Sequence, residues 1–167
     1  MPQASGIVVN GWAIFAHPLF LDEVLELTEK VERHKAKDPG TYKKKNASKR
    51  LAAILKLALT DIPQDPADPK YRQGDTLGDG RKFWFRAKFF QQYRLFFRFH
   101  SEAKVIIYAW VNDEHHKRAY GSRTDAYTIF EKMLESGHPP EDWDQLYEQA
   151  HRAAAAFQRT LARLNDE

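Results

Sequence analysis

Three strand-like runs between residues 83 and 111 constrain the fold of this chain more than any other feature. Phe83–Phe90, Tyr93–His100 and Val105–Val111 are rich in aromatic and β-branched residues, and breaks of two and four residues separate them. Such spacing is typical of an antiparallel meander, in which each strand pairs with the next. The sequence therefore predicts a three-stranded antiparallel sheet over this region.

The turn between the first two runs decides which side chains share a face of the sheet. A two-residue turn would pair Arg86 with Phe97, which buries charge or exposes a row of phenylalanines. Since a slip of one residue moves every side chain to the other face, burial of an apolar face predicts a three-residue turn at residues 91–93. The pairs that follow are Arg86 with Arg98, Lys88 with Phe96, and Phe90 with Arg94.

The cations that this turn places on one face form the first candidate site. Residues 81–123 carry ten Lys or Arg against three Asp or Glu, a net charge of +7, whereas residues 124–167 carry −5. A bound phosphate would relieve the repulsion between these cations, since arginine suits bidentate contact with phosphate. Alternatively, each arginine pairs with a carboxylate from a helix or from the acidic C-terminal region. The phosphate interpretation is favoured for Arg86, Lys88, Arg94 and Arg98.

A polar loop after the third run forms the second candidate site. Residues 112–120 bring a carboxylate, two imidazoles, two cations and a phenol together directly after a strand, where catalytic groups are common. Such a set can supply a general acid and a general base. The spacing of its acidic and histidine residues is not a recognised metal-ligand pattern, so no metal site is predicted.

The rest of the chain is mainly helical. Residues 7–15 read as a strand, and residues 19–36 and 41–60 read as two amphipathic helices that form a hairpin. Prolines and glycines make residues 61–80 an irregular connection. A helix from Thr124 to Gly137 carries Tyr127, Phe130, Met133 and Leu134 at helical spacing, and a last helix begins near residue 140. This order of elements is α+β.

Several classes of protein are excluded or disfavoured by composition. The chain has no cysteine, which excludes disulfides, thiolate metal sites and cysteine nucleophiles. It has no run of 18 apolar residues and no basic-then-apolar start. We therefore expect no membrane partner and a cytoplasmic location.

Blocks of sequence in a fixed order resemble the YhaV toxin family, within the RelE/ParE superfamily of toxins from type II toxin–antitoxin systems. The resemblance runs from about residue 9 to residue 143. The blocks that carry it are VNGW at 9–12, His17-Pro18, YRLFFR at 93–98, VII at 105–107, WVNDE at 110–114, Tyr120-Gly121, TDAY at 124–127 and GHPPEDW at 137–143.

This resemblance implies a fold, an activity and a partner. The fold is RelE-like, with an N-terminal strand and a helical hairpin packed on a twisted antiparallel sheet. Residues 1–143 form the toxin domain, and residues 144–167 extend it as helices. The activity is endoribonuclease cleavage of mRNA, either free or on the ribosome. It requires no metal ion and no other cofactor. The partner is a PrlF-like antitoxin, an AbrB-type swapped-hairpin protein, and operator DNA is contacted only through the antitoxin complex.

The resemblance also carries roles to individual residues. It places the catalytic strand cations at Arg86, Lys88 and Arg94 and a late catalytic tyrosine at Tyr120. Glu114 stands where RelE-type toxins have an arginine, so the acid and the base remain open among Lys88, Glu114, His115 and Tyr120. We expect Arg98, Lys117 and Arg118 to hold flanking phosphates of RNA.

Two other functions are compatible with the same fold. ParE-type relatives inhibit gyrase by binding and are not enzymes, and a plain RNA-binding module would use the same cations without cleavage. The density of cations on one sheet face favours the nuclease.

Overall fold

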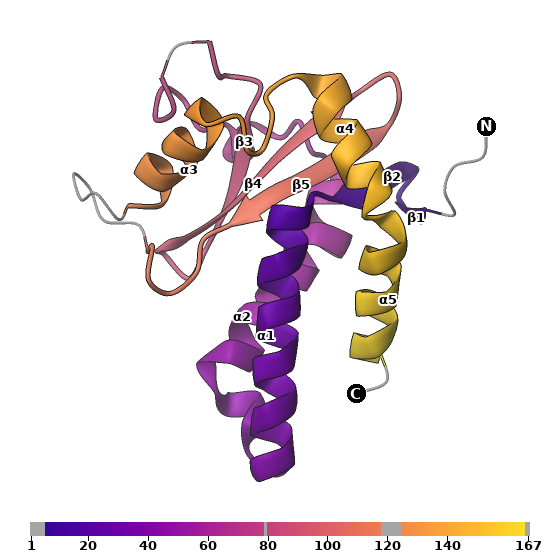
Figure 1. Cartoon of the computed structure of the whole chain (residues 1–167), viewed down its shortest axis with the longest axis vertical. Coiled ribbons are helices and arrows are strands. Elements are labelled where there is room, and N and C mark those ends of the chain that lie inside the picture. Colours follow the sequence, from indigo (N-terminus) through magenta and orange to yellow (C-terminus); the bar gives the residue numbers. More distant parts are fainter. Residues whose placement is uncertain (1–5, 79, 118–124, 166–167) are drawn as a thin grey trace.

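In the computed structural model, which describes residues 6–78, 80–117 and 125–165, five strands form one sheet. The strand order is β1-β2-β5-β4-β3, so the expected meander β3-β4-β5 is present and a pair of N-terminal strands extends it (Figure 1). Helices cover both faces of the sheet, which confirms the α+β class. The strands are β1 Ile7–Val9, β2 Trp12–Ala16, β3 Phe85–Phe89, β4 Tyr93–His100 and β5 Val105–Val111.

The N-terminal segment differs from the single strand expected over residues 7–15. Asn10 and Gly11 both have positive φ, 51° and 82°, which is the backbone of a two-residue type I′ turn. The segment therefore folds into the hairpin β1-β2. Strand β2 then lies parallel to β5, with Ile14 opposite Ile106. The sheet is mixed for this reason, and the expectation of a wholly antiparallel sheet was wrong for this one pair.

The register of β3 and β4 confirms the expected faces but not the expected pairs. The turn has three residues, 90–92, and lies one residue earlier than predicted, so Lys88 is opposite Arg94 and Arg86 is opposite Phe96. Because the pairing moved by two residues, no side chain changed face. Phe85, Leu95, Phe97 and Phe99 pack in the core on one face, as predicted, and the four cations lie on the other.

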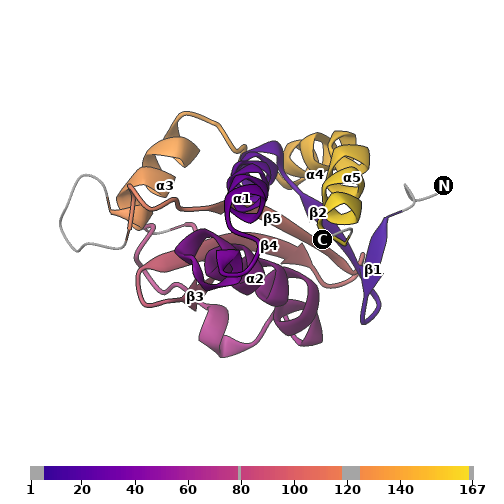
Figure 2. The ribbon, with the colours of Figure 1, turned by 90° about the horizontal axis from the view of Figure 1, so that it is seen from below.

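Two helices form the predicted hairpin against one face of the sheet. These are α1 Pro18–Lys37 and α2 Asn46–Lys56, and Figure 2 shows them side by side with α5 (Ala154–Asn165) next to α1. Side chains such as Phe20, Ile54 and Phe157 are fully buried between these helices and the sheet. No helix in the described ranges combines the length and apolar character needed to cross a bilayer.

The second helix of the hairpin is shorter than expected. Lys45 has an extended backbone, with φ −76° and ψ 152°, and it separates a short 3-10 turn at Tyr42–Lys44 from α2. The turn after α2, Leu57–Asp61, is a π-helix. The helix predicted over residues 41–60 therefore consists of three pieces, and the N-terminus of α2 lies at Asn46.

The other face of the sheet carries a second core. It is covered by α3 Ala126–Glu135 and α4 Trp143–Arg152, which lie above the sheet in Figure 1, whereas α1, α2 and α5 lie below it. The ring of Phe96 stacks on Phe130 at 4.2 Å between centroids. The predicted last helix breaks at Ala153, so that α4 and α5 cover opposite faces. Helix α3 therefore covers part of the cationic face.

Candidate active site

Two buried arginines converge on one phenol under the first turn of α3. Nε of Arg86 donates to the hydroxyl oxygen of Tyr127 at 2.9 Å, and Nε of Arg94 donates to the same oxygen at 3.3 Å. The two arginines are only 9% and 7% exposed. Tyr127 is held in place because the carboxylate of Asp125, the N-cap of α3, accepts from its backbone N–H at 3.1 Å.

The remaining contacts of these two arginines with described residues are to backbone carbonyls. Nη1 of Arg86 donates to the carbonyl of Lys70, and Nη1 of Arg94 donates to the carbonyls of Gln91 and Tyr93. Within the described ranges neither guanidinium has a carboxylate in ion-pair distance, and neither Nη2 group has a partner. The carboxylate alternative from the sequence is therefore not observed for this pair. Guanidinium donors of this kind suit the oxygens of a phosphate.

Lys88 adds a third positive charge to the same place. It lies directly opposite Arg94 in the sheet and is exposed to solvent. Like charges directly opposite one another destabilise a sheet, so this arrangement is costly unless an anion binds there. Arg86, Lys88 and Arg94 are called the cationic triad below.

Arg98 lies on the same face but is not part of this cluster. Its guanidinium stacks over the rings of Phe83 at 4.1 Å, Trp143 at 5.3 Å and Trp84 at 5.6 Å, and its Nη1 donates to the carbonyl of Glu141 at 2.6 Å. Burial lowers the pKa of Arg98 to about 10, which leaves it charged at neutral pH. The sequence predicted a cluster of four cations, and the structure shows Arg86, Lys88 and Arg94 together without Arg98. A contact of Arg98 with RNA stays a prediction.

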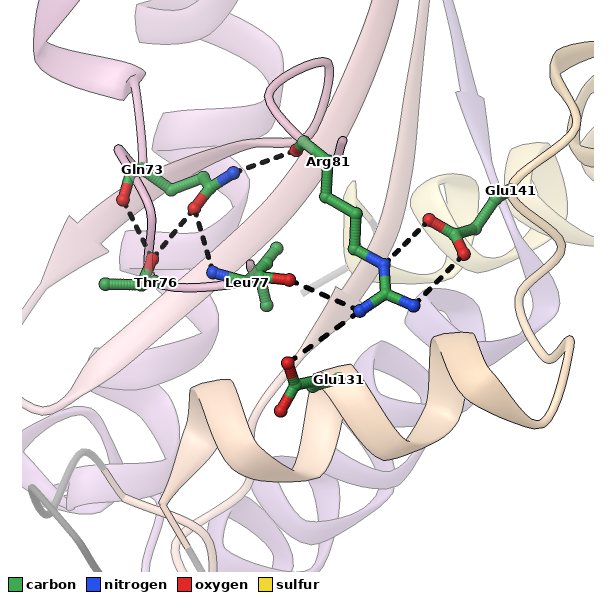
Figure 3. Close-up of polar contacts among 6 residues, drawn as sticks. All are labelled: Gln73, Thr76, Leu77, Arg81, Glu131 and Glu141. Atoms are coloured by element: carbon green, nitrogen blue, oxygen red, sulfur yellow. Dashed lines mark hydrogen bonds and ion pairs between the residues drawn. The ribbon is translucent and has the colours of Figure 1, made fainter. Parts of the chain in front are cut away.

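A network around Arg81 fixes α3 over the triad. Figure 3 shows Arg81 between the carboxylates of Glu141 and Glu131, at 3.0 Å and 3.8 Å, while Nη1 donates to the carbonyl of Leu77 at 3.2 Å. The amide of Gln73 holds the same loop, because it donates to the carbonyl of Arg81 at 2.8 Å and accepts from the N–H of Leu77. The irregular connection thus anchors the helix that carries Tyr127.

The polar loop after β5 is tied to the β3-β4 turn by Asn112. This fully buried amide accepts from the backbone N–H of Arg94 at 2.7 Å and donates to the carbonyls of Gln92 and His116 at 3.1 Å and 2.8 Å. A buried asparagine at the end of a strand is a signal that sequence reasoning could have used, since buried amides need partners. The first residue of the loop, Asn112, is therefore in direct contact with the backbone of Arg94.

The loop residues turn toward the helical hairpin instead of the triad. Glu114 is exposed and forms an ion pair with Lys30 of α1 at 3.6 Å. His115 is exposed, and with Glu114 it lines a small cavity beside α1. Lys117 lines a different cavity, beside α2. The sequence suggested that these three residues join Arg86 and Arg94, but the structure does not bring them together. Arg118 and Tyr120 lie outside the described residues.

Glu23 of α1 is a titratable residue that sequence reasoning missed. Burial, together with the nearby carboxylates of Asp113 and Glu26, raises the pKa of Glu23 to about 7, against the opposing effect of Arg50. From sequence, Glu23 is one more polar residue at the edge of an amphipathic helix. Only the fold brings it against the loop after β5.

The raised pKa of Glu23 predicts a pH-dependent stability. Because the folded pKa lies above the ordinary value of 4.5, protonated Glu23 stabilises the fold below pH 4.5, and this contribution disappears as the pH rises through 7. Relative to the parent, Glu23→Gln should gain about 1 kcal/mol of unfolding free energy between pH 5 and pH 8, after allowance for partial solvent screening. Urea denaturation at both values measures it. Glu29→Gln on the exposed side of α1 is the control, and an equal gain there would contradict the assignment.

Tyr127 is the second missed residue, because the helical pattern marks it only as part of an apolar stripe. Tyr127→Phe removes the oxygen shared by Arg86 and Arg94 and keeps the ring. We expect a loss of about 1–3 kcal/mol in stability. In the endoribonuclease reaction that the resemblance implies, kcat should fall about tenfold with little change in KM. Tyr147→Phe on α4 is the matched control. Unchanged kcat in the Tyr127 variant would reduce this phenol to a packing role.

Comparisons with known proteins define the class of protein to which the chain belongs. Residues 14–151 match a family described as a toxin with endonuclease activity, of toxin–antitoxin systems. The chain is thus a toxin of a toxin–antitoxin system, and an antitoxin is its partner.

Two relatives narrow this class to one family. Toxin YhaV of Escherichia coli O6:H1 (strain CFT073) is 47% identical over 147 residues, which cover 87% of this chain and 96% of the relative. Ribonuclease toxin YhaV of Escherichia coli K12 is 49% identical over 140 residues, which cover 83% of this chain and 91% of the relative. The chain belongs to the YhaV toxin family. No solved structure matches it.

Proposed function

We propose that this toxin cuts mRNA in the cytoplasm, free or on the ribosome, without a metal ion, and thereby stops translation. The observation that carries the proposal is the pair of buried guanidiniums, Arg86 and Arg94, with unpartnered Nη2 groups and no neutralising carboxylate among the described residues. The ribonuclease name of the Escherichia coli K12 relative supports RNA as the substrate.

The chemistry needs only groups of the RNA and of the protein. The 2′-hydroxyl oxygen attacks the adjacent phosphorus and loses its proton to a base, the bond from phosphorus to the 5′-oxygen breaks, and an acid protonates that oxygen. The products are a 2′,3′-cyclic phosphate and a 5′-hydroxyl. Arg86 and Arg94 stabilise the extra negative charge on the pentacoordinate phosphorus.

The acid and the base come from residues around this pair. Lys88 is the solvent-exposed member of the triad and lies directly opposite Arg94 in the sheet, which makes it one candidate. Glu114, His115 and Tyr120 are the other candidates. For Glu114 or His115 to act, the substrate or the loop has to bridge from the α1 side to the triad, since the free protein directs both toward α1.

One experiment separates this proposal from gyrase inhibition and from simple RNA binding. The purified toxin is incubated with RNA in EDTA, and the ends of any fragments are analysed. We expect fragments that carry cyclic-phosphate and 5′-hydroxyl ends. Intact RNA that is nevertheless bound would indicate an RNA-binding module, and inhibition of gyrase supercoiling without RNA cleavage would indicate a ParE-like toxin.

We further propose that the antitoxin is of the PrlF type and covers the cationic triad with at least one carboxylate. An uncovered triad would still attract RNA and leave residual activity. Complementary charges accelerate association and are screened by salt over about 10 Å at 0.1 M ionic strength. The association rate in stopped-flow mixing should therefore fall at least tenfold from 0.05 to 0.5 M salt. A rate that is indifferent to salt would place the antitoxin elsewhere.

A further inference from the structure

A cavity of about 360 Å³ lies between the N-terminus of α2 and the β3-β4 turn. It opens on the α1-α2 side of the sheet and is distinct from the triad, which lies under α3. Three cations and one carboxylate line it, together with two aromatic residues and two amides. The lining residues are Asn46, Lys49, Arg50, Phe90, Gln92, Tyr93, Glu114 and Lys117, and we call it the Arg50 cavity.

Arg50 is a buried cation that forms no ion pair with another described residue. It is 7% exposed, and its Nε atom is buried with no hydrogen-bond partner. Its guanidinium stacks over the ring of Tyr93 at 4.7 Å, and within the described ranges no carboxylate lies in ion-pair distance of it. The nearby carboxyl of Glu23 has a pKa of about 7 and so neutralises Arg50 only in part at neutral pH. A buried charge without a full ion pair lowers the stability of the fold unless a bound anion neutralises it.

Phe90 supplies an aromatic surface at the mouth of the same cavity. Its ring is 53% exposed, and its backbone has a positive φ of 46°, which is unusual for a bulky residue. Exposed aromatic rings beside cations are the typical platform for unpaired nucleic-acid bases, which stack on the ring while the cations hold the backbone.

The cavity and the triad lie on opposite faces of the same end of the sheet. Tyr93 and Arg94 are neighbours in β4, so that Tyr93 packs under Arg50 while Arg94 points to Tyr127. A strand of RNA bound to Arg94 can therefore reach Arg50 by passing around the β3-β4 turn. Beyond the cavity, a second hollow of about 480 Å³ continues the positive surface with Lys30, Lys44 and Lys45.

From this arrangement we infer that the Arg50 cavity binds a nucleotide of the RNA substrate next to the one that is cut, with its phosphate on Arg50, Lys49 and Lys117 and its base on Phe90. The inference rests on the proposed ribonuclease function and adds a subsite to it. Several cations in two adjoining hollows match the repeated charges of a nucleic-acid backbone better than the single carboxylates of a folded protein.

The test measures the affinity for an RNA oligonucleotide that is methylated at every 2′-oxygen and so cannot be cut. Phe90→Ala changes an exposed side chain and should leave the fold intact, but it should weaken binding by about 5–100-fold. Arg50→Met keeps apolar packing on Tyr93 and removes the charge. It should weaken binding and lower the slope of log affinity against log salt by about 0.7, the value for one lost phosphate contact in a single strand.

Lys43→Met is the matched control, because this exposed lysine precedes α2 but does not line the cavity. Its affinity for the RNA should equal that of the parent. If both cavity variants bind RNA like the parent while the parent cuts RNA, the subsite is wrong and the proposed function stands. If they weaken only the complex with the antitoxin, the cavity is a protein docking site and the inference fails. A parent that never cuts RNA would refute the function itself.

Discussion

Replacement of Arg86 by alanine is expected to lower the rate of RNA cleavage by about 10²–10³-fold, the usual effect of removing one group that stabilises transition-state charge. Arg86 is buried between Tyr127 and the carbonyl of Lys70, so its guanidinium is already oriented before RNA binds. Orientation in the free protein is what makes such a group effective, because no reorganisation is needed during the reaction.

The measurement is single-turnover cleavage of a short RNA at saturating enzyme. Arg152→Ala is the control, since its side chain is 73% exposed and its ion pair within the described part of the chain is with Glu148 on the same helix. The Arg86 variant should keep a cooperative unfolding transition and should still bind the antitoxin. A folded variant that cuts RNA as fast as the parent would mean that the active site lies elsewhere.

Replacement of Phe130 by alanine should have the largest effect on stability, about 3–5 kcal/mol. Its fully buried ring stacks on Phe96, meets Trp84 edge-on at 5.0 Å and lies 5.8 Å from Trp110. These contacts attach α3 to the sheet. Because a domain is typically stable by only 5–15 kcal/mol, a loss of this size removes much of the margin.

Urea denaturation of the Phe130 variant measures this loss, with Lys132→Ala on the exposed side of α3 as the control. Cleavage should fall as well, because α3 carries Tyr127 to the arginine pair. A destabilisation below about 1 kcal/mol would show that α3 is held mainly by other contacts, such as the Arg81 network.

The sequence predicted the two faces of the meander because burial constrains the parity of the register. It did not predict the pairs themselves, since a shift of two residues leaves every side chain on its face. The turn decides between such registers, and here Phe90 and Gln91 adopt positive φ without the glycine or asparagine that usually marks it. The parallel pairing of β2 with β5 was missed because a long-range pair leaves no local pattern.

The sequence predicted the positively charged part of the candidate site. Arg86, Lys88 and Arg94 lie together because their strands are adjacent and their spacing is fixed by the pleat. Glu114 and His115 were misplaced because a loop has no periodicity that reveals its direction. Tyr127 and Arg50 were missed because each occupies a helix position that reads as ordinary packing or an ordinary charged face.

We propose above all that Arg86 and Arg94 hold the phosphate that is cut. A crystal structure of the toxin with an RNA that is methylated on the attacking 2′-oxygen tests it most directly. We expect oxygens of the scissile phosphate at about 2.7–3.2 Å from the Nη2 groups of both arginines. An RNA whose methylated nucleotide lies on another surface, with both Nη2 groups still facing water, would contradict the claim.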